Sequence, residues 1–151
     1  MPTVSHEQQV NAAPERVWEF ITALRYLPVW MDGVTSVRAI SDPSGSAGTT
    51  FTIIRRGRHE DESWIVAEYE ASRRVRLVEY RRNHELILLL QPDPIGTRLR
   101  IEYTWPSEWG ILDRILRPTT QHQMVERSLA RLREMFSLNQ DIKLIYGMGD
   151  E

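Results

Sequence analysis

The sequence contains no cysteine among its 151 residues. A chain without thiols cannot form disulfides, thiolate metal sites or a cysteine nucleophile. Lysine is almost missing as well, because Lys143 is the one lysine among 19 basic residues. The net charge is -2, which gives no indication of a surface built to bind polyanions. We therefore expect no nucleic-acid partner.

Long hydrophobic runs are also absent. No apolar stretch approaches the ~20 residues that a membrane-spanning helix needs, and the N-terminus lacks the apolar segment of a signal peptide. We therefore expect a soluble, cytoplasmic protein without integral membrane association. A chain of 151 residues is most simply one domain, 1–151. Its tail, residues 139–151, is predicted to be flexible.

Familiar catalytic and cofactor motifs are not found either. The chain has no Ser-His-Asp order, no HExxH, no Walker loop and no GxGxxG. Its four histidines are too scattered for their spacing to indicate a metal site; they are His6, His59, His84 and His122. We therefore expect neither a metal nor a cofactor.

The clearest feature that is present is a long helix over residues 109–138, either kinked or restarted at Pro118. Its apolar side chains fall at i, i+4, i+7 and i+11, the spacing of one helical face, at Val125, Leu129, Leu132 and Phe136. His122 extends that face backward. A helix with one apolar stripe must pack on another layer, and the upstream strands can provide that layer.

The strands precede this helix. Alternation and turn residues predict seven of them, at 3–10, 34–40, 49–56, 62–70, 75–82, 86–91 and 97–105. Two short helices follow the first strand, one starting at Pro14 and one over residues 26–31. This order predicts an α+β fold in which an antiparallel sheet has one solvated face.

Six local motifs, in this order and spacing, resemble a known superfamily. They are Ala13-Pro14-Glu15-Arg16-Val17-Trp18, Leu27-Pro28-Val29-Trp30, Gly48-Thr49-Thr50-Phe51, Trp64-Ile65-Val66-Ala67-Glu68-Tyr69, Arg73-Arg74-Val75-Arg76-Leu77 and Gly96-Thr97-Arg98-Leu99. Together they resemble the helix-grip fold of the START-like (SRPBCC) superfamily, which includes the birch-pollen allergen and the bacterial polyketide cyclases. The resemblance implies a curved seven-stranded antiparallel sheet that grips the C-terminal helix, with a cavity between them.

Strand alternation predicts which side chains would line such a cavity. The inward face of the strand at 62–70 is predicted to carry Ile65, Ala67 and Tyr69, and Glu79 is expected to point outward. For the strand at 86–91 both orientations stay open. The predicted ligand-binding residues are Phe51, Ile53, Tyr69, Leu99, Ile101, Tyr103, Trp105, Trp109, His122, Val125 and Leu129. A mostly apolar cavity with a few polar tips is typical of a small-molecule site.

Catalytic candidates are fewer: His122 as an acid-base group, Arg55 and Tyr69. The aromatic polyketide cyclases are expected to place an arginine in the pocket from the fourth strand. This sequence has Tyr69 there, and Arg55 on the adjacent strand could replace the charge. Alternate turns of a meander fall at one sheet end, which predicts a basic rim of Arg55, Arg56, Arg58, His59, Arg81, Arg82 and His84.

Three functions therefore stay open. The first is the binding of a small hydrophobic molecule, which the basic rim allows to be anionic. The second is a cyclase or dehydratase that acts on an aromatic polyketide-like intermediate, presented by an acyl carrier protein. The third is a chaperone-stimulating protein-interaction module. The sequence leaves open whether the chain is an enzyme and whether it is a monomer or a homodimer.

Overall fold

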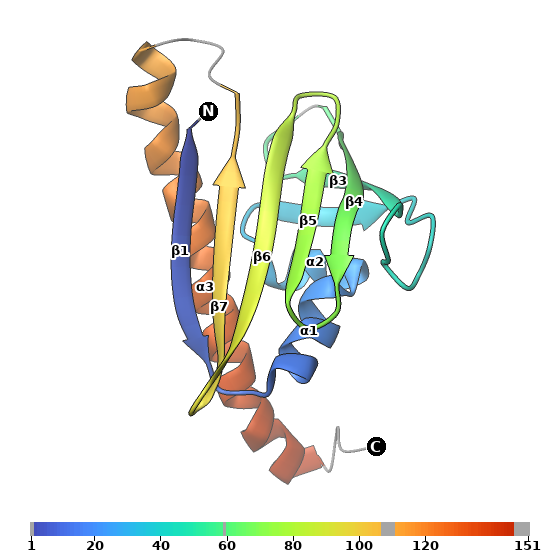
Figure 1. Ribbon diagram of the computed structural model, residues 1–151, viewed down its shortest axis with the longest axis vertical. Helices are drawn as coiled ribbons and strands as arrows, with labels where there is room; N and C mark the ends of the chain where they lie inside the picture. The colour runs from blue at the N-terminus through green and yellow to red at the C-terminus, as the bar shows by residue number, and fades with distance from the viewer. Residues whose placement is uncertain (1, 59, 107–110, 147–151) are drawn as a thin grey trace.

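The computed structural model describes residues 2–58, 60–106 and 111–146, and the side chains of 111–119 and 138–146 lie outside the described part. Within it, one curved sheet covers a long C-terminal helix, with shorter helices beside the sheet (Figure 1). None of the described helices is long and apolar enough to cross a membrane.

The sheet is antiparallel and has seven strands in the order β1-β7-β6-β5-β4-β3-β2. The strands are β1 (Thr3–Val10), β2 (Val34–Arg38), β3 (Thr50–Arg55), β4 (Glu62–Glu70), β5 (Arg74–Glu79), β6 (His84–Asp93) and β7 (Gly96–Thr104). Strand twist accumulates across the sheet, so β2 and β3 run almost crosswise to β1 and β7 (Figure 1). The predicted helix-grip arrangement is confirmed.

The described residues also form four helical segments: α1 (Pro14–Thr22), the 3-10 turn η1 (Leu24–Tyr26), α2 (Leu27–Trp30) and α3 (Ile111–Tyr146). Pro14 stands in the first turn of α1, where its missing N–H costs no hydrogen bond. Helix α3 runs without interruption through Pro118. It also extends past Leu138, so residues 139–146 of the predicted tail are helical.

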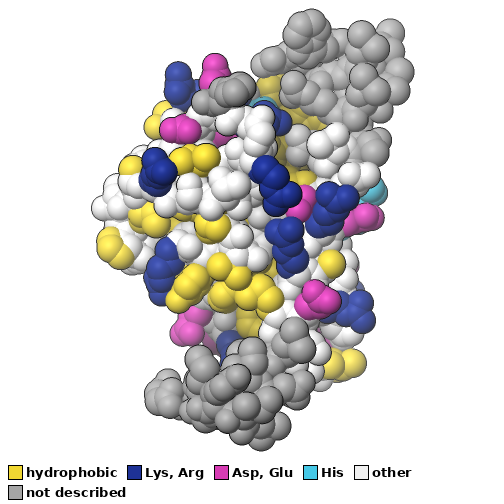
Figure 2. All heavy atoms as spheres, turned by 180° about the vertical axis from the view of Figure 1, so that it is seen from behind, with side chains coloured by type: hydrophobic (Ala, Val, Ile, Leu, Met, Phe, Trp, Pro, Cys, Tyr) yellow, Lys and Arg dark blue, Asp and Glu magenta, His cyan; other side chains and the backbone are white. Residues whose placement is uncertain are grey.

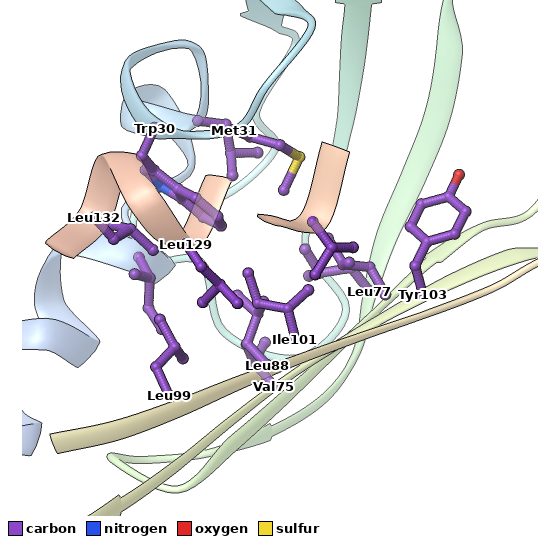
Figure 3. Close-up of a cluster of buried hydrophobic side chains, with 14 of the residues drawn as sticks. Trp30, Met31, Val75, Leu77, Leu88, Leu99, Ile101, Tyr103, Leu129 and Leu132 are labelled. Atoms are coloured by element: carbon purple, nitrogen blue, oxygen red, sulfur yellow. The ribbon is translucent and has the colours of Figure 1, made fainter. Parts of the chain in front are cut away.

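The predicted face of α3 is the buried face. Val125, Leu129, Leu132 and Phe136 are at most 6% exposed. In Figure 3, Leu129 and Leu132 lie above Leu99, Leu88 and Ile101 of the sheet, and all five belong to one buried apolar cluster. Leu86, Leu88 and Leu90 all point inward, which settles the orientation of β6.

The predicted orientation of β4 is wrong over most of its length. Trp64 and Val66 are buried, whereas Ile65 is half-buried and Ala67 is exposed. A register shift between Val66 and Glu68 then inserts one extra residue, so that Tyr69 pairs with the buried Val75. A β-bulge reverses the alternation beyond it, which is why Tyr69 packs against the core although Ile65 and Ala67 do not.

Candidate functional site

The candidate site lies at the end of the sheet where the β3–β4 and β5–β6 turns meet. The two turns are joined by an ion pair between Arg82 and Glu60, as expected for alternate turns of a meander. After β3 the chain turns at Gly57, whose φ of 73° is a conformation that side chains with a Cβ rarely adopt. The Arg58 N–H donates to the Arg55 carbonyl at 3.3 Å and closes this turn.

Arg55 carries its guanidinium into the interior from the last position of β3. Phe51 and Ile53 precede it on the same face. Arg55 Nε donates to Glu62 Oε2 at 2.8 Å, and both side chains are about nine-tenths buried. The other oxygen of Glu62 accepts a hydrogen bond from Trp64 Nε1 at 2.9 Å. Within the described residues, Arg55 Nη2 has no hydrogen-bond partner. Glu62 therefore holds the guanidinium through Nε, and the buried Nη2 keeps unused hydrogen-bonding capacity.

Tyr103 reaches the same end of the sheet from β7. Its hydroxyl lies 2.6 Å from Nδ1 of His84, and its ring packs beside Trp105. In Figure 3, Tyr103 stands apart from the apolar cluster, with its hydroxyl pointing away from the leucines. Burial is the main reason that the pKa of Tyr103 is raised to about 12. The negative charges of Glu62 and Glu79 raise this pKa further, and the positive charges of Arg55 and Arg58 lower it. The phenol therefore keeps its proton at neutral pH.

Glu79 organises the β5–β6 turn from inside. One carboxylate oxygen accepts the backbone N–H groups of Arg81 and Arg82 at 2.8 and 2.6 Å. The other accepts the N–H of Ser63 at 2.7 Å. Glu79 is 2% exposed, so the expectation that it points outward is wrong. Three backbone donors satisfy a carboxylate that would otherwise be costly to bury.

Helix α3 forms the opposite wall. It is tied to the turn between α2 and β2, because Asp32 accepts a hydrogen bond from Arg131 at 3.0 Å and its backbone N–H donates to Ser128 Oγ at 2.9 Å. Arg127 lies 3.8 Å from the same carboxylate. Viewed from the α3 side, cationic side chains stand beside acidic ones near the centre of the molecule (Figure 2). These contacts fix the helix over the sheet end.

Between the two walls is a pocket of about 210 Å³. The sheet side contributes Arg55, Glu62, His84 and Tyr103, and the helix side contributes Thr120, Gln121, Gln123, Met124 and Arg127. Arg56 and Arg58 stand at its exposed mouth. Four arginines face two carboxylates, Glu62 and Asp32, so the charge of the pocket favours an anionic group.

Most residues predicted to line a cavity lie elsewhere. Seven of them belong to the buried apolar core, at no more than 2% exposure: Phe51, Ile53, Leu99, Ile101, Trp105, Val125 and Leu129. Tyr69 accepts a hydrogen bond from Trp18 Nε1 at 3.0 Å. Trp109 lies outside the described residues. Of the predicted ligand-binding set, Tyr103 lines the pocket, and of the catalytic candidates, Arg55 does.

The prediction for His122 needs correction. Its side chain is 51% exposed, so it does not belong to the buried stripe of α3. It lies instead against His6 of β1, with ring centroids 3.9 Å apart. An α-helix has 3.6 residues per turn, so position 122 falls on the flank of the face that Val125 and Leu129 define. Helix α3 crosses the edge strand β1 at this position.

The predicted basic rim divides into two parts. Arg55, Arg56 and Arg58 line the pocket, whereas Arg81 and Arg82 lie beside a separate depression with Glu60, Asp61 and Glu79. His59 lies outside the described residues. Sequence reasoning missed Glu62, although it shares strand alternation with Trp64 and Val66. That shared alternation places Glu62 on the buried face of β4 and could have identified it.

The fold and pocket define a helix-grip protein whose pocket opens between the sheet end and the C-terminal helix. The chain belongs to the family described as polyketide cyclase / dehydrase and lipid transport, whose model matches residues 1–136. This places it in the START-like superfamily that the motifs resemble. None of the curated proteins matches the sequence.

Solved structures show the same fold. Protein MLL2253 from Mesorhizobium loti is 17% identical, with a TM-score of 0.72 over 90% of this chain and 97% of that one. The KanY protein is 14% identical, with a TM-score of 0.74 over 90% and 97% of the two chains. TTHA0849 from Thermus thermophilus is 23% identical, with a TM-score of 0.71 over 91% and 99%.

Proposed function

We propose that the chain binds a small molecule with an apolar body and an anionic or enolic oxygen. The molecule would lie in the pocket between the sheet end and α3, which we call the Arg55–Tyr103 pocket. The observation that carries this proposal is the buried guanidinium of Arg55, which Glu62 holds by one edge while Nη2 is left without a partner among the described residues. Planar guanidinium groups bind carboxylates and related oxyanions through such paired N–H donors.

The ligand is proposed to lie with its oxygen between Arg55 and Tyr103 and its apolar part against Met124. Both donors come from rigid strands, so little conformational entropy is lost when they meet a ligand. The pocket of about 210 Å³ is below the ~300–1,000 Å³ of drug-sized sites, which favours a small ligand or one end of a longer one. The membership of a family whose description includes lipid transport supports the same class of ligand.

A matched pair of probes tests this proposal: octanoate and octanol, which share an alkyl chain and differ in charge. Binding can be followed by tryptophan fluorescence, since Trp105 packs beside Tyr103. We expect octanoate to bind more tightly. Arg55→Lys should weaken octanoate by roughly tenfold or more, because a charge-assisted hydrogen bond contributes about 1.5–3 kcal/mol.

Arg133→Lys is the matched control, because Arg133 is exposed on α3 and lies outside the Arg55–Tyr103 pocket. Far-ultraviolet circular dichroism confirms that each variant is folded. Equal affinity for octanoate and octanol, or an Arg55→Lys protein that binds like the parent, would contradict the proposal.

A cyclase or dehydratase activity is the second candidate, favoured by the contact of 2.6 Å between Tyr103 and His84 inside the pocket. Arg55 would stabilise an enolate oxygen, and Tyr103 would donate a proton to it. The test is incubation with a poly-β-keto thioester, followed by mass spectrometry for cyclised or dehydrated product. Tyr103→Phe should abolish turnover, and it should weaken octanoate binding less than Arg55→Lys does, because a neutral hydrogen bond contributes less than a charge-assisted one. Product formation that survives this substitution would remove Tyr103 from the chemistry.

An acyl carrier protein is the partner we propose for a tethered ligand, because Arg56 and Arg58 are exposed at the mouth of the pocket. At 0.1 M salt the Debye length is ~10 Å, and attraction between exposed charges farther apart than this is largely screened. Replacing both arginines by glutamate should therefore weaken binding of an acidic carrier protein at low salt, and much less at high salt. Binding insensitive to both changes would argue against this partner.

A further inference from the structure

His6 and His122 are 116 residues apart in sequence, yet their rings meet at the edge of the sheet. His6 Nε2 lies 2.7 Å from His122 Nδ1 and 3.0 Å from His122 Nε2. His6 is paired with the buried Ile101 in the register of β1 and β7, so its side chain points toward α3. Figure 1 shows α3 lying along β1 at this edge.

A carboxylate completes the group. Glu126 follows His122 by four residues, which places both side chains on one face of α3. Its Oε1 atom lies 3.8 Å from Nε2 of His6 and 3.8 Å from Nε2 of His122. One donor atom from each of the three residues lies within 4.8 Å of the other two. Two imidazoles and one carboxylate are a donor set that zinc accepts in proteins.

The separations suit a metal ion with small side-chain movements. Zn–N and Zn–O bonds of ~2.0–2.2 Å at tetrahedral angles place neighbouring donor atoms roughly 3.3 Å apart. The imidazole nitrogens are slightly closer than that and the carboxylate slightly farther, so rotation about the side-chain bonds can equalise them. His6 is 24% exposed, and His122 and Glu126 are each more than half exposed. An ion can therefore enter from solvent, and water can occupy a fourth position.

We propose that His6, His122 and Glu126 form a binding site for a divalent transition-metal ion, with Zn²⁺ as the ion that best fits the donor set. Such an ion joins the edge strand β1 to α3. The residues on either side of His122, Gln121 and Gln123, line the Arg55–Tyr103 pocket. The metal therefore fixes the part of α3 that forms the helix wall of that pocket. This inference does not depend on what the pocket binds.

The test is titration of the purified chain with Zn²⁺, followed by calorimetry and by thermal unfolding. We expect one ion per chain and a rise in the melting temperature with ion concentration, because a ligand that binds the native state stabilises it. His6→Gln and His122→Gln should each weaken binding by about 100-fold or more, since loss of an outer-sphere partner alone costs ~10–100-fold. Glu126→Gln should weaken it by about tenfold or more.

Glu134→Gln is the matched control for Glu126, because Glu134 is an exposed carboxylate on the same helix. A second variant gives a spectroscopic readout. The chain has no cysteine, so His122→Cys introduces a single thiol, and thiolate also binds Zn²⁺ and Co²⁺. This variant should retain the metal, and its Co²⁺ form should gain a sulfur-to-metal charge-transfer band.

Three results would overturn the proposal. They are the lack of one-to-one binding, binding that persists unchanged in both histidine variants, and equal behaviour of Glu126→Gln and Glu134→Gln. Circular dichroism of the metal-free variants is expected to show each one folded, because His122 and Glu126 are more than half exposed.

Discussion

The inner face of the sheet has two regions of opposite character. Toward the middle of α3, leucine and isoleucine side chains fill the space between sheet and helix (Figure 3). Toward the β3–β4 and β5–β6 turns, the same face carries buried Glu62, Glu79 and Arg55 together with Tyr103. A buried leucine stabilises the fold by about 1.5–3 kcal/mol, whereas a buried charge costs several kcal/mol unless it is paired.

This difference shows where stability and function are separated in the molecule. Burial of apolar surface does not explain the charged groups at the turn end, because each of them costs free energy to bury unless it is paired. Each carboxylate is satisfied by two or three donors, which keeps the polar end rigid. The apolar region holds α3 in place, and the polar end presents donors to the pocket.

The largest expected effect comes from the apolar region. Leu132→Ala truncates a fully buried side chain on the inner face of α3 and should lower the free energy of unfolding by about 2–5 kcal/mol. Arg133→Ala, one residue along on the exposed face, should change it by less than about 0.5 kcal/mol. Urea denaturation followed by circular dichroism measures both. Similar small effects at the two positions would show that the helix face is not packed.

The next effect concerns alkaline pH. Burial raises the pKa of Tyr103 to about 12, whereas an unfolded tyrosine titrates near ~10. The native phenol therefore keeps its proton at pH values where the unfolded one has lost it. This contribution is complete below pH ~10, and about 2–3 kcal/mol of stability is lost as the pH rises to ~12.

Tyr103→Phe should remove this part of the alkaline loss, and Tyr80→Phe is the control because Tyr80 is 56% exposed. Urea denaturation at several pH values between about 9 and 12 gives the slopes across the titration range, and tyrosinate absorbance reports the titration directly. If the Tyr103→Phe protein loses stability as steeply as the parent, the raised pKa is not the cause.

A smaller effect separates buried from exposed carboxylates at the polar end. Glu79→Gln replaces one acceptor oxygen by an N–H₂ group that faces a backbone donor, and it should cost about 1–3 kcal/mol. Glu60→Gln, at an exposed ion pair with Arg82, should cost no more than about 1 kcal/mol. Thermal unfolding of the two variants under identical conditions gives the comparison. Equal costs would mean that burial of Glu79 adds nothing.

The sequence by itself determined the seven strands, their antiparallel meander and the buried face of α3. These follow from local periodicity, since side chains at spacings of two or 3.6 residues share one face. It also identified Arg55, because the residue continues the alternation of Phe51 and Ile53. The motifs were sufficient to indicate the superfamily.

The tertiary structure alone decided the rest. The bulge in β4 reverses the alternation before Tyr69. The alternating pattern of the sequence does not indicate where such an extra residue is inserted. Glu79 is buried because three backbone N–H groups converge on it. His6 meets His122 because α3 crosses the edge strand at that height. Each depends on distances between segments far apart in the chain, which local patterns do not contain.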